Sequence, residues 1–258
     1  MRFASLGSGS QGNALVIESG RTRVLLDCGF PLREVQVRLA RFGLAASDIS
    51  GIIVTHEHGD HGEGVFPLSR RFGIPVWLTH GTIAAMRDVG NDIDRECEFH
   101  LIDSHSAFAV GDLLVQPFTV PHDAREPVQF VLSDGARRLG VLTDTGCPTA
   151  HVEASLSGCD ALVLECNHDL DMLINGDYPS ALKARIGGRL GHLDNGASGA
   201  ILGAIDRSRL KHVIAAHLSQ KNNTPELARA ALAAALNCEP GWVAVASQEE
   251  GFGWRDLT

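Results

Sequence analysis

From residue 55 to residue 62 the chain reads Thr-His-Glu-His-Gly-Asp-His-Gly, with four potential metal ligands in this short stretch. The stretch follows the apolar run Gly-Ile-Ile-Val at residues 51–54, whose β-branched residues predict a short buried strand. In an extended chain, side chains two residues apart point to the same side, so His56 and His58 can bind one metal ion together. The ligands therefore lie just past the end of a strand.

Asp60 and His61 follow at a turn that the two glycines of the stretch permit. Their offset directs them to a neighbouring point in space, so one loop can serve two metal ions. Histidine nitrogen and aspartate oxygen suit zinc, and also manganese or iron. A solvated, acidic and histidine-rich surface loop has the same composition, and the stretch alone leaves that alternative open.

Other potential ligands also follow apolar runs that predict buried strands. They are His122, Asp144 and His217. Sheets commonly form binding sites in the cleft at the ends of their strands. We therefore expect these three side chains to converge on the histidine-rich stretch.

Hydrophobic periodicity predicts a chain in which strands and helices alternate after a β-rich opening. We predict strands at residues 2–6, 14–18, 22–27, 51–54, 75–79, 113–120, 128–132, 139–142, 161–164, 213–216 and 241–246. We predict helices at residues 32–42, 64–72, 82–89, 197–205 and 225–236. Thr224 is expected to cap the last of these helices, because Pro225 and Glu226 follow it.

The composition indicates a globular protein. At 258 residues, with 44% hydrophobic and 21% charged residues, the chain can bury a substantial core, and we predict a single domain over residues 1–258. The six cysteines form no C-x-x-C pair, and no apolar run is long enough to span a bilayer. We therefore expect a cytoplasmic protein with reduced thiols and no membrane partner. The oligomeric state is not predicted.

The formal charge of −9 argues against broad wrapping of nucleic acid, which needs a basic face. It does not exclude an anionic substrate, because bound divalent cations offset acidic side chains locally.

The order of these motifs resembles that of the metallo-β-lactamase superfamily, namely the histidine-rich stretch, the single His122, the Thr-Asp-Thr-Gly turn at 143–146 and the late His217. Further segments resemble the YycJ/WalJ group of that superfamily. They lie at residues 6–13, 164–169, 178–186, 191–193 and 217–227. Cys166 and Asp194 stand where that group more often has serine.

The resemblance implies an α/β fold, a four-layer αββα sandwich of two mixed sheets. It implies one metal ion held by His56, His58 and His122. The ligands that it implies for the second ion are Asp60, His61 and His217. Asp144 would bridge the two ions, with a water or hydroxide between them. Two divalent ions are therefore the expected cofactors, with zinc as the expected metal and manganese or iron as the alternatives.

Phosphodiester hydrolysis also needs a proton for the leaving oxygen. His192 is the candidate donor and Glu165 the carboxylate that orients it, in an arrangement similar to that of the related transfer-RNA 3′-processing enzymes. Together with Asp60 they form the expected catalytic set. A loop histidine beside Gly191 with no catalytic part is the alternative reading of His192.

Several side chains are candidates for binding the substrate. They are Ser8, Ser10, Asn13, Lys183, Arg185, Ser219, Asn222 and Asn223. The first three lie on a glycine-rich turn that can offer donors to a terminal phosphate, or that simply connects two strands. The two cations can equally belong to a solvated helix face. The last three can bind substrate or support His217.

The resemblance implies a dinuclear metal-dependent hydrolase, a phosphodiesterase or 5′-to-3′ exonuclease acting on DNA or oligonucleotides. The seven ligands are equally compatible with hydrolysis of a small thioester, lactone or cyclic phosphate. A metal-binding module without hydrolysis is the third possibility.

Overall fold

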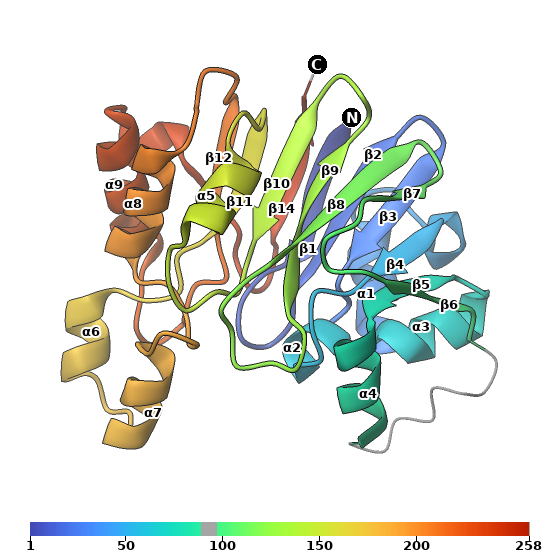
Figure 1. Cartoon of the computed structure of the whole chain (residues 1–258), viewed down its shortest axis with the longest axis horizontal. Helices are drawn as coiled ribbons and strands as arrows, with labels where there is room; N and C mark the ends of the chain where they lie inside the picture. Colours follow the sequence, from blue (N-terminus) through green and yellow to red (C-terminus); the bar gives the residue numbers. More distant parts are fainter. Residues whose placement is uncertain (89–96, 258) are drawn as a thin grey trace.

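Two seven-stranded β-sheets stack face to face in the computed structural model, which describes residues 1–88 and 97–257 (Figure 1). The first sheet has the order β14 (Phe252–Asp256), β1 (Arg2–Gly7), β2 (Ala14–Ser19), β3 (Thr22–Leu26), β4 (Gly51–Ile53), β5 (Val76–Thr79) and β6 (Phe99–Ile102). The second has the order β13 (Ala244–Val245), β12 (His212–Ala216), β11 (Ala161–Glu165), β10 (Arg138–Leu142), β9 (Val128–Ser133), β8 (Leu113–Thr119) and β7 (Phe108–Val110).

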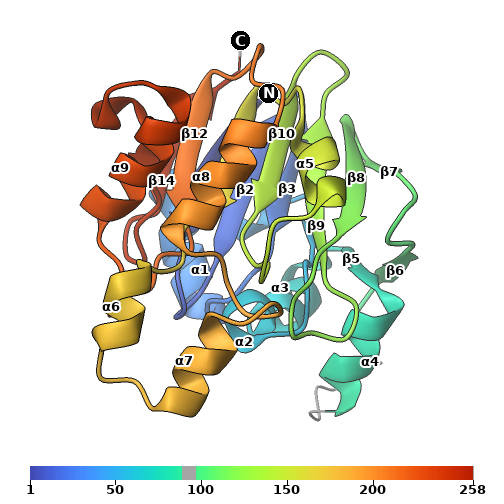
Figure 2. The same ribbon diagram turned by 60° about the vertical axis from the view of Figure 1, so that its left-hand side comes forward.

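Helices cover the outer face of each sheet (Figures 1 and 2). The first sheet packs against α1 (Leu32–Ala40), α3 (Val65–Phe72) and α4 (His80–Asp88), and the second against α5 (Ala150–Leu156), α8 (Asn195–Ala204) and α9 (Pro225–Leu236). Three short helices, α2 (Gly59–Gly62), α6 (Leu170–Asn175) and α7 (Ser180–Ile186), lie in both views at the end of the molecule opposite the chain termini. The predicted four-layer αββα sandwich is confirmed.

Three apolar layers hold the sandwich together. Side chains alternate across each strand, so Ile17 of β2 enters the layer between the sheets whereas Val16 faces the outer layer with α1. The central layer contains Phe130 and Ile214, both fully buried. Leu232 of α9 lies in the third layer, outside the second sheet. Burial of apolar surface on both faces is what the strands' continuous hydrophobic runs require.

Parallel pairing brings the ends of neighbouring strands together. Val141 of β10 pairs with Val163 of β11, and Val163 pairs with Ile214 of β12, all in parallel register. The carboxyl ends of these three strands therefore meet at one edge of the second sheet. In the first sheet, Leu26 of β3 pairs in parallel with Ile53 of β4. Residues that follow these five strands are positioned to form a common site.

The strand predicted at residues 241–246 is wrong over most of its length. Pro240–Trp242 form a 3₁₀ turn in which the Val243 N–H donates to the Pro240 carbonyl at 3.2 Å. Only Ala244–Val245 pair with β12. Of the helix predicted at 82–89, residue 89 lies outside the described residues. In the described part of the chain, no helix is both long enough and apolar enough to cross a membrane.

Candidate metal centre

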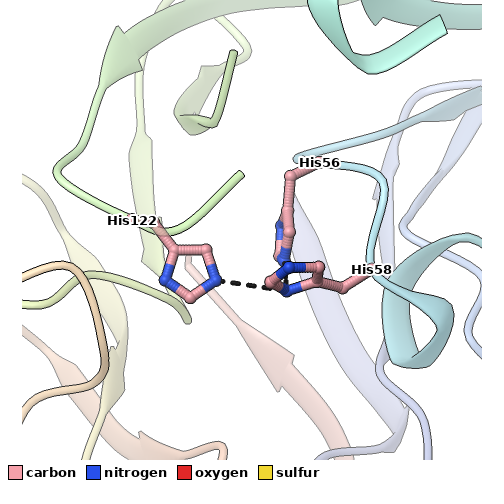
Figure 3. Close-up of side chains that lie close together, drawn as sticks. All are labelled: His56, His58 and His122. Atoms are coloured by element: carbon pink, nitrogen blue, oxygen red, sulfur yellow. Dashed lines mark hydrogen bonds between the residues drawn. The ribbon is translucent and has the colours of Figure 1, made fainter. Parts of the chain in front are cut away.

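His56, His58 and His122 form a first group of potential ligands (Figure 3). The first two follow β4 and the third follows β8. His58 Nδ1 lies 3.0 Å from His56 Nε2 and 3.3 Å from His122 Nε2. Figure 3 shows the three rings directed toward one another from two separate loops. Three imidazole nitrogens meeting at one point form a donor set typical of zinc sites.

Asp60, His61 and His217 form a second group. The first two lie on α2, a single helical turn where the sequence predicts only a turn. His217 follows β12 with a left-handed backbone, φ 55°. Asp60 Oδ2 lies 3.4 Å from His61 Nε2 and 3.3 Å from His217 Nε2. The two groups share the loop after β4, so they are adjacent.

Asp144 lies between the two groups and is 1% exposed. Its Oδ2 is 3.1 Å from His61 Nε2, in the second group, and its Oδ1 is 3.9 Å from His122 Nε2, in the first. A single carboxylate in this position can contact ions in both groups. All seven side chains predicted as ligands therefore lie together in the structure.

Oxygen atoms behind the ligands fix the orientation of the imidazole rings. The contacts made by Nδ1 are His56 to Thr55 Oγ1 at 2.9 Å, His61 to Asp27 Oδ2 at 2.7 Å, His122 to the Gly191 carbonyl at 3.0 Å and His217 to Glu165 Oε1 at 3.3 Å. A proton held on Nδ1 leaves the Nε2 lone pair free and directed inward, as in protein metal sites. The residues present therefore fit a bound metal ion.

The electrostatics of the cluster also favour cations. Burial alone would raise the pKa of Asp144, but His217 and His61 outweigh it and hold this pKa well below the ordinary aspartate value. Burial likewise opposes ionisation of Asp60, yet the charge of His61 and the hydrogen bond to His217 hold the pKa of Asp60 far below normal. Both carboxylates therefore remain ionised at neutral pH.

The histidines fall into two electrostatic classes. Burial and the neighbouring charge of His61 keep the pKa of His56 well below the ordinary histidine value. Burial also acts to lower the pKa of His217, but Asp144 and the hydrogen bonds to Asp60 and Glu165 outweigh burial and raise this pKa to about 10. Before an ion binds, the protons held by histidines of this second class, such as His217, balance the negative charge of the carboxylates.

Glu165 and His192 form a pair at the rim of the cluster. Glu165 is the last residue of β11, fully buried, and its Oε1 lies 2.7 Å from His192 Nδ1. The Glu165 Oε2 accepts the Thr145 N–H at 2.9 Å, which fixes the carboxylate. Burial would lower the pKa of His192, but the charge and hydrogen bond of Glu165 raise it. The His192 side chain is 20% exposed, so part of the ring is accessible to solvent at the edge of the cluster.

Of the candidates on the glycine-rich turn, two contact the ligands. Ser8 Oγ accepts the backbone N–H of His217 at 2.9 Å and donates to Asn13 Oδ1 at 3.1 Å. Asn13 Nδ2 lies 3.2 Å from His61 Nε2. Ser10 is exposed at the tip of the turn. The polar groups of Ser8 and Asn13 therefore support ligand residues, whereas Ser10 lies apart from them.

Among the remaining candidates, Arg185 lies at the metal cluster and Lys183 does not. Arg185 Nε donates to Asp123 Oδ2 at 2.6 Å, next to His122. Lys183 Nζ donates to the Ile174 carbonyl at 2.7 Å, which closes α7 onto α6.

Of the three polar residues after His217, Ser219 and Asn223 make structural contacts through their side chains and Asn222 through its backbone N–H. Ser219 Oγ accepts the Asn222 N–H at 3.2 Å, which closes the turn that follows the ligand. Asn223 Nδ2 donates to the Cys166 carbonyl at 2.7 Å and to Asn195 Oδ1 at 2.9 Å. These contacts support the loop that carries His217.

Two acidic residues of this region have no role in the sequence-based prediction. Asp27 follows β3 and accepts hydrogen bonds from the Thr55 N–H at 2.8 Å and the Thr55 hydroxyl at 2.9 Å, besides orienting His61. Asp123 pairs with Arg185. Asp27 carries a usable signal, because it ends an apolar strand as the predicted ligands do. For Asp123, the only signal in the sequence is its position directly after His122.

Comparison with known proteins gives a consistent result. A family model described as "Beta-lactamase superfamily domain" matches residues 22–218. Exodeoxyribonuclease YycJ of Bacillus anthracis is 33% identical over 253 residues, which cover 98% of this chain and 91% of that protein. Exodeoxyribonuclease WalJ of Streptococcus pneumoniae is 31% identical over 229 residues, 88% of this chain and 85% of that one.

A solved structure extends the likeness to the fold. The metallo-beta-lactamase fold protein YhfI of Bacillus subtilis aligns with a TM-score of 0.76 over 98% of each chain. The sequences are 16% identical, so this likeness concerns the architecture alone.

Proposed function

Because this chain belongs to the metallo-β-lactamase superfamily, we propose that it is a metal-dependent phosphodiesterase that degrades DNA or oligonucleotides as a 5′-to-3′ exonuclease. The observation that carries the proposal is the convergence of five histidines and two aspartates from four strand ends, with Glu165 and His192 at the rim. The naming of two relatives as exodeoxyribonucleases supports the nucleic-acid substrate.

The cofactors in this proposal are two divalent ions, zinc in the first instance. His56, His58 and His122 would hold one ion, while Asp60, His61 and His217 would hold the other. Asp144 would contact both. When bound, such ions lower the pKa of water and offset the negative charge of a phosphodiester.

His192 supplies the acid in this proposal. Its Nδ1 is occupied by Glu165 at 2.7 Å, so the exposed part of the ring delivers the proton to the leaving oxygen. Asp144 Oδ1 lies 3.5 Å from the same Nδ1, which further favours the protonated ring. Glu165 keeps the ring in one orientation between turnovers.

We also propose that the protein acts in the cytoplasm. All six cysteines are free thiols, and Cys28 and Cys166 are buried, where burial raises the pKa of each thiol to about 12. Unreactive buried thiols without disulfides are typical of a reducing compartment.

The test combines metal analysis with a panel of substrates. We expect the purified protein to hold two equivalents of zinc or manganese. It should hydrolyse bis-p-nitrophenyl phosphate and 5′-phosphorylated single-stranded DNA, and DNA labelled at either end should show shortening from the 5′ end. Turnover of S-lactoylglutathione or a lactone, with neither phosphodiester cleaved, would overturn the proposal.

Ligand substitution gives a second test. Asp60→Ala or His122→Ala should abolish phosphodiesterase activity while the circular dichroism spectrum stays that of the folded protein, because each residue contributes to one of the two ligand groups. Undiminished turnover in either variant contradicts the assignment.

A further inference from the structure

An arginine beside the metal cluster is held by a carboxylate that has no part in the proposed chemistry. We propose that Arg185, positioned by Asp123, forms a subsite for the phosphate group adjacent to the one being cleaved. The inference rests on the proposed function and extends it, because it assigns a residue to the substrate strand beyond the scissile bond.

Asp123 is fastened between the cluster and α7. It directly follows the ligand His122, and its backbone N–H donates to the Leu190 carbonyl at 2.9 Å. Its Oδ1 is buried without a hydrogen-bond donor among the described residues, 3.5 Å from His122 Nε2 and 4.0 Å from His58 Nε2. Its Oδ2 receives the Arg185 Nε–H at 2.6 Å. The carboxylate thus connects the arginine to two ligands of one group.

Arg185 is fixed at one end of its guanidinium and open at the other. The Nε contact to Asp123 is the only hydrogen bond of the Arg185 side chain within residues 1–88 and 97–257, and that side chain is 60% exposed. The two terminal nitrogens are therefore available to solvent or ligand. A guanidinium held through Nε presents its remaining N–H groups as a fork that matches a phosphate.

The helix that carries Arg185 also lies at the rim of the site. None of the residues of α7 is buried, so the helix packs little against the sandwich. Its last residue, Ile186, accepts the backbone N–H of His192 at 2.8 Å, which ties the helix to the proposed proton donor. Both views place α7 at the same end of the molecule as α2, which carries Asp60 and His61 (Figures 1 and 2). The exposed Leu190, 54% accessible, completes this rim.

The position and charge of Arg185 indicate that it binds a phosphate next to the scissile one and not the scissile phosphate itself. Ions held by the ligand groups would neutralise the scissile phosphate, whereas Asp123 separates Arg185 from these groups, with Oδ1 near His58 and His122 and Oδ2 bound to Arg185. In a chain with a formal charge of −9, a second phosphate needs a local cation to approach. Arg185 provides one without a general basic surface.

The experiment compares two substrates that differ in their number of phosphates. Bis-p-nitrophenyl phosphate has one phosphodiester, whereas a 5′-phosphorylated oligonucleotide presents several. For Arg185→Gln we expect kcat/KM on the oligonucleotide to fall about tenfold, mainly through KM, as for loss of one charge-assisted hydrogen bond. Activity on bis-p-nitrophenyl phosphate should stay within twofold of that of the unmodified chain.

The salt dependence of kcat/KM distinguishes a phosphate contact from a purely structural role, because only loss of a phosphate contact changes it. Loss of one phosphate contact should flatten the slope of log kcat/KM against log salt by about 0.7 on a single strand. Arg185→Lys should restore most of the slope but only part of the KM, because lysine lacks the fork. The matched control is Arg23→Gln. Arg23 lies on β3, away from the site, and its Nε also bonds a carboxylate, that of Glu18, at 2.7 Å.

The role of Asp123 is tested by a double-mutant cycle. Asp123→Asn should reduce the ratio of oligonucleotide to bis-p-nitrophenyl phosphate turnover, and adding Arg185→Gln should lower that ratio no further. Additive losses would overturn the positioning role. Equal loss on both substrates, or none, in Arg185→Gln would overturn the subsite. If the unmodified chain cleaves neither phosphodiester, the proposed function itself fails and the subsite fails with it.

Discussion

At the scale of single residues, Asp27 shows how much of the candidate metal centre lies behind the ligands. Its Oδ2 faces His61 Nδ1 at 2.7 Å and also accepts the Thr55 hydroxyl, whose oxygen faces His56. One carboxylate therefore sets the rings of a ligand in each group. We expect Asp27→Asn to weaken zinc binding about 10- to 100-fold, as is usual when such a partner is lost. Competition with a zinc chelator measures the change.

Asp112→Asn is the matched control for Asp27→Asn. The Asp112 carboxylate also accepts a backbone N–H and a threonine hydroxyl, from Arg21 and Thr22, but at a turn remote from the ligands. Equal zinc affinities in the two variants would contradict the role assigned to Asp27.

His192 gives a prediction about the leaving group. His192→Ala should lower kcat on DNA by about 10²- to 10⁴-fold, the usual contribution of a general acid. The loss on bis-p-nitrophenyl phosphate should be smaller, because p-nitrophenolate departs without protonation. Steady-state rates on both substrates, at constant metal content, provide the measurement. A uniform loss would indicate that His192 supports the ligands instead.

The ligands could be predicted from sequence because each follows a strand end or lies in one short stretch. The supporting residues could not, because their partners are distant along the chain. Asp27 and His61 are separated by 34 positions, and Asp123 and Arg185 by 62. Such pairs depend on which strands become neighbours. The metal number, the substrate contacts and the roles of Glu165 and His192 remain predictions.

At the scale of elements, Asp160 fastens the strand ends opposite the site. It precedes β11, is 1% exposed, and accepts the Arg138 N–H at 2.9 Å. Its oxygens also pair with Arg137 and Arg209, each at 3.1 Å. Burial would raise the pKa of Asp160, but the hydrogen bonds and charges of these arginines lower it. We expect Asp160→Asn to reduce the free energy of unfolding by about 1.5–3 kcal/mol at pH 7.

The pH dependence of that effect follows from the sign of the shift. A carboxyl whose pKa is lower in the folded state than the unfolded value of about 3.9 stabilises the fold fully above that value. The contribution disappears as pH falls through the folded pKa. Denaturant titrations of the unmodified and Asp160→Asn chains should therefore converge below about pH 4. A difference that is constant down to pH 2 would exclude an electrostatic origin.

Local sequence signals predict the long elements well. Thr224 caps α9 as predicted, accepting the Leu227 N–H at 3.2 Å, and Gly73 ends α3 in the left-handed conformation. The failure at residues 241–246 is also instructive, because Trp242 and Val243 have high β-propensity but follow a proline-glycine pair that closes a turn. The short helices α5 and α6 give too few periodic positions to be predicted.

At the scale of the whole molecule, the metal centre joins the two sheets. His56 to His61 belong to a loop of the first sheet, whereas His122, Asp144 and His217 follow strands of the second. Removal of metal with a chelator should therefore lower the thermal unfolding midpoint, and added zinc should restore it. A ligand at a thousand times its Kd stabilises by about 4 kcal/mol. Identical midpoints by calorimetry would contradict ion binding at the junction.

The number of independently folding units is a separate question at this scale. The central apolar layer joins side chains from both sheets, among them Phe3, Phe130 and Ile214. That residues 1–258 form a single domain remains a prediction, which a single cooperative transition in denaturant would support.

The pairing of β14 with β1 has a consequence for synthesis on the ribosome. Residues 252–256 supply the strand that covers one edge of β1, at residues 2–7. During translation that edge has no partner while some 250 residues emerge, so a nascent chain presents it to other polypeptides throughout elongation. Premature termination shortly before Phe252 would leave every ligand in place on a chain that is prone to aggregate.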